Sequence, residues 1–376
     1  MPGVHGGFVD GPGASGGLLG GGTGGFHEED HPRDAEGKFA PGAGGDDSGA
    51  SGGGSGQGGS GHGPEGTSKG ARADGKPLTE GQKAAKSLAG RPGMSPATPD
   101  SLAAMKEERG IAVPPGWADV QLADDPNSAC QAVGLDAEGR TQPKMSAAHT
   151  AQAKVEKHER CRIFYTVVPS IEYRAQEDMG GTGKSREDAA CLLLIKHTGA
   201  RVGGDEAKSK GQKTYGASTL EARHVTIEGA TARLDFIGKT GKRNVYEVTE
   251  PHLVADLEAR KAAAESDDAR LYDTSDDRLR RYLKTAAGGQ EFKVHDFRTR
   301  VATMTAYKAA EGMEVPKTPE AFWKQWDEVG EIAAARINDE RAVALDTYVD
   351  PKVFFAWRNA AGVGEDDARP KRKAKS

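Results

Sequence analysis

Glycine, serine, aspartate and proline dominate the first 104 residues of the chain, in runs such as GGGTGG and SGGGSGQGGSG. A segment of this composition offers too little apolar surface to offset the entropy that is lost when a chain is ordered. It predicts a disordered, Gly-rich tail over residues 1–104. Folded structure is therefore expected in the rest of the 376-residue chain, up to a second, basic and disordered tail over residues 361–376.

Charge, hydropathy and cysteine content narrow the class of protein. The Gly-rich tail carries 8 basic and 12 acidic residues, which leaves 43 basic against 44 acidic residues in the remainder, so any surface that binds nucleic acid must be a local patch. No apolar run is long enough to span a bilayer, and a secretory signal is missing, so we expect a soluble, cytoplasmic protein. The three cysteines have no paired spacing, so we expect reduced thiols and no metal site.

The folded part contains recognisable local patterns. SREDAACLLLI begins with the spacing of a capping box and the run stops before Gly199, which predicts a buried helix over residues 185–198. HVTIEG, ARLDFIG and RNVYEV alternate apolar with polar residues between Gly-containing turns, and predict a three-stranded antiparallel meander. Four helical segments follow Pro251, and Asp350-Pro351 predicts the start of a further helix.

Four residues with the chemistry of phosphate transfer accompany these elements. Arg201 follows the predicted helix in TGARVGGDE, and Lys239 falls in the second turn of the meander, in GKTGK. Arg298 lies in HDFRT, and Tyr348, in TYVDP, lies on a short linker between helical segments. Two guanidinium groups can donate paired hydrogen bonds to a phosphodiester, a lysine can protonate a leaving alkoxide, and a tyrosine can attack phosphorus. The set predicts metal-free cleavage of DNA.

In order and spacing these residues resemble those of the type IB DNA topoisomerases, in the compact form found in poxviruses and bacteria. The resemblance runs from about Ile111 to about Trp357, and AVPPGWADVQL and QAVGLDAEGR look like the opening strands of that family's small amino-terminal domain. It implies an α+β protein with a small β-rich DNA-clamp domain over residues 105–150. A mainly helical catalytic domain, similar to that of tyrosine recombinases and containing the three-stranded sheet, would cover residues 151–360.

The resemblance also implies an activity and a partner. It implies cleavage of one strand through a 3′-phosphotyrosyl intermediate, strand rotation and religation, with no ATP, metal or other cofactor. The partner would be double-stranded DNA clamped by a monomer, with no nucleotide and no membrane. Arg201, Lys239, Arg298 and Tyr348 would be catalytic. DNA contacts would come from Arg140, Gln142, Lys144, Lys213, Tyr215, Lys242, Arg243 and His295.

Two positions depart from the family's pattern. A histidine or asparagine commonly lies nine residues before the tyrosine as a further donor to the phosphate, whereas this chain has Asp339, a carboxylate that would repel it. Either Asn338 takes the role through a one-residue slip, which we favour, or the donor is missing and the enzyme is slower. The lysine that usually lies three residues before the second arginine is replaced by His295.

Other functions stay open at this point. His295 and Arg298 fit the His-x-x-Arg box of tyrosine recombinases, although the Leu-Gly-His segment that usually precedes their tyrosine is absent. Asp339 leaves room for a catalytically impaired DNA-binding protein on the same scaffold. GGTGKS at 180–185 is similar to a phosphate-binding loop, but Asp178 stands where that pattern needs glycine. In the Gly-rich tail, DHPRDAEGKFAP resembles linkers of phage-encoded proteins, which suggests a phage or bacterial origin.

Overall fold

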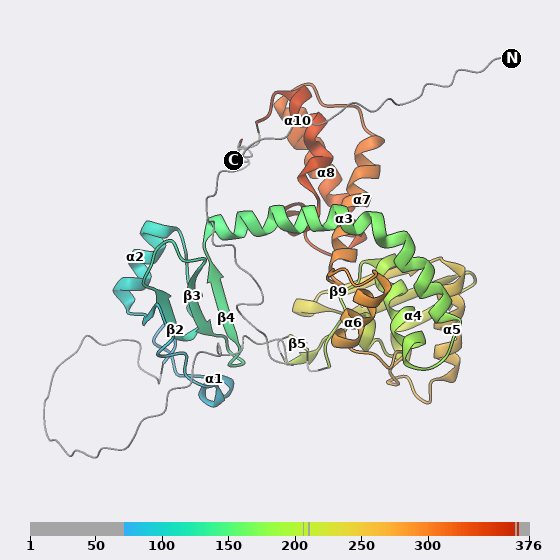
Figure 1. Ribbon diagram of the computed structural model, residues 1–376, viewed down its shortest axis with the longest axis horizontal. Helices are drawn as coiled ribbons and strands as arrows, with labels where there is room; N and C mark the ends of the chain where they lie inside the picture. Colours follow the sequence, from blue (N-terminus) through green and yellow to red (C-terminus); the bar gives the residue numbers. More distant parts are fainter. Residues whose placement is uncertain (1–70, 206, 210, 365–366, 368–376) are drawn as a thin grey trace, which may run out of the picture. The chain divides into compact units, whose positions relative to one another are not determined.

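The computed structural model describes residues 71–205, 207–209, 211–364 and 367. The first 70 residues of the predicted Gly-rich tail and most of the predicted basic tail lie outside the described residues. The described chain forms a four-stranded antiparallel sheet, followed by a mainly helical part that contains a two-stranded and a three-stranded antiparallel sheet (Figure 1). The predicted α+β class is confirmed.

The four-stranded sheet and two short helices form the first part, which we call the sheet module. Its elements are α1 (Glu80–Ala84), β1 (Met94–Pro96), α2 (Pro99–Arg109), β2 (Ala118–Ala123), β3 (Cys130–Leu135) and β4 (Thr141–Met145), with the strands in the order β1-β2-β3-β4. The predicted domain start at residue 105 falls inside α2 and is too late. Leu88 and Ala97, which precede residue 105, are the reason, because they are buried in the small cores around Val133 and Trp117.

Helices form most of the remaining chain. They are α3 (Ala147–Met179), α4 (Gly183–Thr198), α5 (Pro251–Ala263), α6 (Asp276–Ala286), α7 (Asp296–Glu311), α8 (Pro319–Arg336), α9 (Arg341–Val343) and α10 (Phe355–Ala361). Short helical turns lie at η2 (Ala217–Thr219), η3 (Ala222–His224), η4 (Lys239–Gly241), η5 (Ala344–Tyr348) and η6 (Pro351–Phe354). The helical segments predicted after Pro251 are confirmed, and the Asp350 side chain accepts a hydrogen bond from the Lys352 amide at the start of η6, as expected of an N-cap.

The long helix α3 is bent, as Figure 1 shows. Pro169 lies inside it and can supply the bend, because proline lacks the amide hydrogen of one helical hydrogen bond and its ring crowds the preceding turn. α3 packs against α4, α6 and α7.

Helix α4 is buried from Asp188 to Ile195, as its apolar run predicts. It begins two residues before the predicted start, and the predicted capping box at Ser185 is wrong. Thr182 is the N-cap and makes no side-chain hydrogen bond. Asp188, the expected partner of Ser185, instead forms an ion pair with Arg278 at 2.9 Å, so a long-range charge pair replaces the local motif.

The three-stranded sheet carries the turn that contains Lys239. Its strands are β7 (Val225–Glu228), β8 (Thr231–Ile237) and β9 (Arg243–Val248), and a hairpin of β5 (Lys208–Ser209) and β6 (Gln212–Lys213) precedes it. Ala232, Leu234 and Phe236 alternate toward the core along β8. The predicted meander is confirmed, and Lys239 lies in η4 between β8 and β9.

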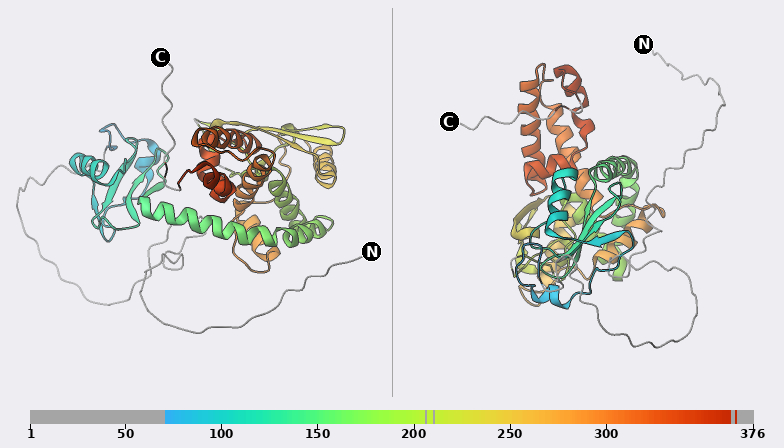
Figure 2. Two further views of the ribbon diagram at one scale, coloured as in Figure 1. Left: turned by 90° about the horizontal axis from the view of Figure 1, so that it is seen from above. Right: turned by 90° about the vertical axis from the view of Figure 1, so that its left-hand side faces the viewer.

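Two apolar cores lie in the helical part. The first surrounds α4 and includes Leu192, Leu194 and Phe297. The second joins α7, α8 and α10, which pack together at the carboxyl-terminal end of the fold (Figure 2). Tyr348 belongs to this second core, so the predicted nucleophile is held by tertiary packing.

Candidate active site

Arg201 lies in a loop whose path depends on two glycines. Gly203 has φ +98°, and a Cβ on Gly216 would lie 2.5 Å from the carbonyl oxygen of Arg201. The two segments can therefore cross only because both lack side chains here. The Ala217 amide donates to the Arg201 carbonyl at 2.9 Å and fixes the crossing. The sequence thus holds Arg201 just beyond the end of α4, as predicted.

Arg298 is placed by the first turn of α7 and is 1% exposed. Its Nη1 donates to the carbonyl of Gly199, the C-cap of α4, at 2.8 Å, and its Nη2 donates to Oδ2 of Asp339 at 2.8 Å. Burial opposes the charge of Arg298, but Tyr246 and Asp339 favour it and leave its pKa raised. The first turn of α7 is itself anchored, because Arg160 on α3 donates two hydrogen bonds, at 3.0 and 2.9 Å, to the buried Asp296.

Asp339 brings the two predicted arginines together. Its Oδ2 accepts from Nη2 of Arg201 at 3.0 Å as well as from Arg298. Burial would raise the pKa of Asp339, but the bonds from Arg298 and from the Glu340 amide lower it below its ordinary value, so the group is a carboxylate at neutral pH. One oxygen atom therefore bridges both guanidinium groups.

Asn338 does not reach the arginines. It has φ +50°, and its amide side chain bonds both backbone groups of Val245 on β9, at 2.9 and 3.1 Å. This pairing ties the end of α8 to the sheet and directs Asp339 inward. The preference for Asn338 over Asp339 at this position of the site is not supported by the geometry.

Tyr348 ends the π-helical turn η5 and is 2% exposed. Its carbonyl accepts from the Thr303 hydroxyl at 3.1 Å, which fixes its backbone against α7. Its hydroxyl lies 3.2 Å from Nε2 of His295. Neighbouring atoms that limit its solvation, followed by the charges of Arg201 and Arg298, lower the pKa of His295 to about 4, although the residue is exposed at the surface and solvent weakens this shift. A neutral imidazole therefore faces the phenol at neutral pH.

Lys157, which the sequence analysis missed, also contacts Tyr348. Its ammonium lies 5.0 Å from the centre of the Tyr348 ring, and Cζ of Arg298 lies 5.1 Å from the same centre. Lys157 also donates to the Thr347 carbonyl. Desolvation lowers the pKa of Lys157. Two cations thus lie near the ring of the predicted nucleophile.

A sequence signal for this contact exists. Lys154, Lys157 and Arg160 recur every three residues, which places them on one face of a helix. Along that face Lys154 pairs with Asp346 at 2.6 Å, next to the Lys157 bond, and Arg160 pairs with Asp296. The face therefore binds both the segment that carries Tyr348 and the start of α7.

Lys239 is not joined to this network. It is exposed on η4, and within the described residues its side chain has no hydrogen bond or ion pair. The turn has left-handed backbone at Thr240, with φ +65°. The structure therefore brings together Arg201, Arg298, His295 and Tyr348 and leaves Lys239 on a neighbouring exposed turn.

Comparisons with known proteins agree with this geometry. Residues 146–353, more than half of the chain, match the family described as eukaryotic DNA topoisomerase I, catalytic core. The chain belongs to the type IB DNA topoisomerases. It is also 28% identical over 265 residues to the DNA topoisomerase 1B of Acanthamoeba polyphaga mimivirus, over 66% of this chain and 78% of that protein. The resemblance found in the sequence is confirmed, and the enzyme is an isomerase.

Two predicted DNA contacts in the helical part of this topoisomerase form ion pairs with carboxylates of the protein. Arg243 pairs with Asp235, and Lys213 pairs with Glu221 at 2.8 Å. The Lys213 ammonium also lies 4.9 Å from the ring centre of Tyr215, whose hydroxyl accepts from Arg223. Lys242 is half-exposed between Gly241 and Arg243. The Arg243–Asp235 pair is largely exposed and contributes little to stability, so a DNA phosphate could replace Asp235 at small cost. Glu221 is buried, and it also pairs with Arg223, which would remain its partner if Lys213 bound DNA.

The predicted contacts of the topoisomerase's sheet module follow the same pattern. Arg140 and Gln142 both donate to Oδ2 of Asp136 at 2.8 Å. The Lys144 ammonium lies 6.0 Å from the ring centre of Trp117. Asp136 thus holds Arg140 and Gln142 beside the edge strand β4, whereas Lys144, on the same strand, faces an aromatic ring.

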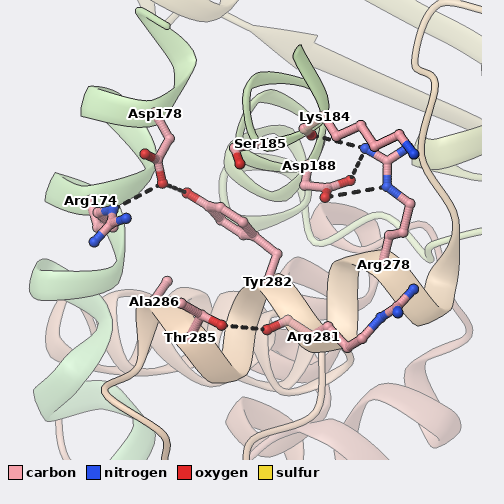
Figure 3. A pocket seen from close by; sticks show the side chains of 10 residues that line it. All are labelled: Arg174, Asp178, Lys184, Ser185, Asp188, Arg278, Arg281, Tyr282, Thr285 and Ala286. Carbon is pink, nitrogen blue, oxygen red and sulfur yellow. Dashed lines mark hydrogen bonds and ion pairs between the residues drawn. The ribbon is translucent and has the colours of Figure 1, made fainter. Parts of the chain in front are cut away.

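GGTGKS, the loop similar to a nucleotide-binding motif, borders a surface pocket of about 400 Å³ (Figure 3). α3 leads into the loop, whereas a phosphate-binding loop follows a strand. Asp178 occupies one wall and pairs with Arg174 and the Tyr282 hydroxyl, and Arg278 opposite bonds Asp188 and the Lys184 carbonyl (Figure 3). The pocket lies at the start of α4, roughly 24 Å along the helix from the end that carries Arg201. It is therefore separate from the active site.

Over the described ranges, no helix combines the length and the apolar character that crossing a membrane requires. In the same part of the chain, no three His, Cys, Asp or Glu side chains lie together as ligands for a metal ion.

Proposed function

We propose that this topoisomerase cleaves one strand of duplex DNA by attack of Tyr348 on a phosphodiester, without nucleotide or metal. The product would be a 3′-phosphotyrosyl bond and a free 5′ hydroxyl. Rotation of the downstream duplex would release torsional strain before the reverse reaction reseals the strand. The observation that carries the proposal is the single network in which Arg201, Arg298, His295 and Tyr348 meet.

The first step needs a proton acceptor for the phenol. Forming a tyrosine phenolate at pH 7 costs about 4 kcal/mol from its ordinary pKa near 10. Neutral His295 can accept the proton through Nε2 when its other ring nitrogen carries hydrogen. The bound phosphate would offset the charges of Arg201 and Arg298, which lower the pKa of His295 in the free protein, and would make it a stronger base.

The second requirement is charge on the phosphate. As the tyrosine oxygen bonds to phosphorus, negative charge grows on the non-bridging oxygens. Arg201 and Arg298 would donate hydrogen bonds to these oxygens from fixed positions, which stabilises the transition state more than the ground state. Lys157 and Arg298, close to the ring, would favour the phenolate through its π system.

The third requirement is a proton for the leaving group. The bond from phosphorus to the 5′ oxygen breaks, and an alkoxide leaves slowly unless it is protonated. Lys239 would donate this proton from its ammonium. Because Lys239 is exposed on η4, we propose that bound DNA completes its position.

The substrate is expected to be double-stranded DNA held by a monomer, in the compartment that contains DNA, the cytoplasm or nucleoid of a bacterium or of an infected cell. We assign Arg140, Gln142 and Lys144 of the sheet module to DNA contacts. Lys213, Tyr215, Lys242 and Arg243 would contact the same duplex from the helical part. Binding should weaken steeply with salt, because each phosphate contact releases counterions.

The test is relaxation of supercoiled plasmid in EDTA without nucleotide. The parent should relax the plasmid and Tyr348→Phe should not. Tyr307→Phe, at an exposed tyrosine on α7, is the matched control and should relax it like the parent. A requirement for ATP or a divalent ion, or relaxation by Tyr348→Phe, would refute the proposal.

A tyrosine recombinase is the alternative favoured by one observation, the contact of His295 with Tyr348. It is tested by incubating two duplexes that share a cleavage site. A recombinase would exchange strands between them, whereas the proposed activity returns each strand to its own duplex.

A further inference from the structure

The two arginines of the site already bind an anion that belongs to the protein. Oδ2 of Asp339 lies 3.0 Å from Arg201 Nη2 and 2.8 Å from Arg298 Nη2. A phosphodiester oxygen bound by both guanidinium groups would need to occupy the same place. A buried guanidinium requires a counterion, and Asp339 provides one for Arg298.

We infer that Asp339 is a resident anion that competes with the scissile phosphate for Arg201 and Arg298, and that its displacement slows cleavage. The inference rests on the proposed function, because it assumes that these arginines bind the phosphate. It goes further because it assigns Asp339 a role that opposes phosphate binding, whereas a hydrogen-bond donor at this position would support phosphate binding.

The surroundings of Asp339 allow its side chain to move while its backbone stays in place. The Asp339 amide donates to the Ala334 carbonyl at 2.9 Å, and the preceding Asn338 is tied to Val245. The side chain is 13% exposed, so the carboxylate has a path to solvent. Rotation about the Cα–Cβ bond would free both guanidinium groups without unfolding the loop.

The nucleophile is also covered in the same state. Tyr348 is 2% exposed, and its hydroxyl faces His295. Asp339 thus occupies both guanidinium groups while the tyrosine is buried, so access for a phosphate requires both side chains to move. DNA must displace the Asp339 carboxylate to reach the arginines, and a carboxylate that remains nearby repels the phosphate.

The experiment measures single-turnover formation of the covalent adduct on a nicked duplex whose short 5′-hydroxyl fragment dissociates after cleavage. Asp339→Asn should form the adduct roughly tenfold or more faster than the parent, because a like charge beside the phosphate is removed. Asp339→Glu, which retains the charge, should be no faster than the parent. Glu340→Gln, an identical charge change at the next and exposed residue, is the control and should match the parent.

The outcomes separate this inference from the proposed function. If the parent forms an adduct through Tyr348 and Asp339→Asn is equal or slower, the inference is overturned and the proposed function stands. Equal acceleration by Asp339→Glu or by Glu340→Gln would also overturn it. If the parent forms no adduct, the proposed function itself fails.

A second measurement, of melting temperature, keeps the inference testable if Asp339→Asn folds poorly. Asp339→Asn removes the counterion of Arg298 and should lower the melting temperature of the protein. Inorganic sulfate is a replacement anion, so it should raise the melting temperature of Asp339→Asn more than that of Glu340→Gln. A sulfate effect that is equal in the two variants would contradict the inference, because the arginine site would then not have been vacated.

Discussion

Tyr348 and Arg298 are almost fully buried, at 2% and 1% exposure, whereas Lys239 is exposed on the turn between β8 and β9. The first two residues are held by the packing of α7 and α8 and by hydrogen bonds to Thr303 and Gly199. Lys239 is placed only by the backbone of its turn. The difference teaches that tertiary packing fixes the proposed nucleophile and one of the proposed phosphate-binding arginines, whereas the proposed acid is fixed by its turn alone.

The two regions also differ in the energy that holds them. Burying an aromatic side chain such as Tyr348 contributes about 1.5–3 kcal/mol, and a hydrogen bond to a charged group such as Arg298 contributes about 1.5–3 kcal/mol. An exposed lysine gains neither contribution. Substitutions should therefore affect stability and cleavage together in the first region, and cleavage alone in the second.

The largest expected effect is that of Lys239→Ala. Loss of a general acid should slow cleavage about 10³-fold, with no change in melting temperature because the side chain is exposed. The rate is measured in single turnover on ordinary duplex DNA. Replacing the 5′ oxygen at the scissile bond with sulfur should restore most of it, because a thiolate leaves without protonation. If Lys239→Ala stays equally slow on the sulfur-containing DNA, the proton donor is another group.

Arg298→Lys should slow cleavage about 10²-fold, since one ammonium cannot keep the paired hydrogen bonds of a guanidinium. Unlike Lys239→Ala, it should also destabilise the protein, because the Gly199 carbonyl and Asp339 both lose a donor. Denaturant titration beside the cleavage assay measures both. Arg336→Lys is the comparison, since Arg336 bonds the Thr198 carbonyl but not Asp339. The Arg336→Lys variant should lose stability and keep the parent's cleavage rate. Slow cleavage by both Arg298→Lys and Arg336→Lys would indicate a general structural effect.

The pH dependence of stability tests the surroundings of His295. Its pKa is about 4 in the folded protein against an ordinary value of 6.5, so the folded state disfavours protonation. The unfolded chain binds the proton first, and stability falls as the pH drops from about 6.5 toward 4. The full shift corresponds to about 3 kcal/mol, and because His295 is exposed, solvent screening reduces the contribution to about 1–2 kcal/mol. Urea titrations at pH 7 and pH 4 give the loss of unfolding free energy between the two pH values. This loss should be larger in the parent than in His295→Gln by the stated amount, and equal losses would contradict the lowered pKa of His295.

Lys157→Met should have the smallest effect and slow cleavage about tenfold. A decrease of this size corresponds to the interaction free energy of a partly buried cation with an aromatic ring. Its pH–rate profile should also move to higher pH, because the phenolate loses a nearby charge, and a merely structural role would not move that profile. Lys157→Arg should recover most of the rate. A profile that stays in place would remove Lys157 from the chemistry.

Much of the site could be predicted because its signals are local. Strand alternation in β8 and the Gly-containing turn after it located Lys239, and Gly199 marked the end of α4 before Arg201. The proposal that Tyr348 is the nucleophile came from the order of Arg201, Lys239, Arg298 and Tyr348 along the chain.

What could not be predicted depends on contacts between distant residues. Ser185 has the spacing of a capping box, yet Asp188 forms its ion pair with Arg278, ninety positions later. The choice between Asn338 and Asp339 depended on Val245, which binds Asn338 from another element. Lys157 lies on a helix remote from the motifs, and only its spacing with Lys154 and Arg160 hinted at a shared face.

The most direct measurement is to identify the residue that carries the DNA. A nicked duplex is incubated with the protein, the adduct is digested with protease and nuclease, and the linked peptide is sequenced by mass spectrometry. The account predicts a nucleotide joined through its 3′ phosphate to Tyr348. Linkage to another residue, linkage through a 5′ phosphate, or an adduct that still forms in Tyr348→Phe would contradict it.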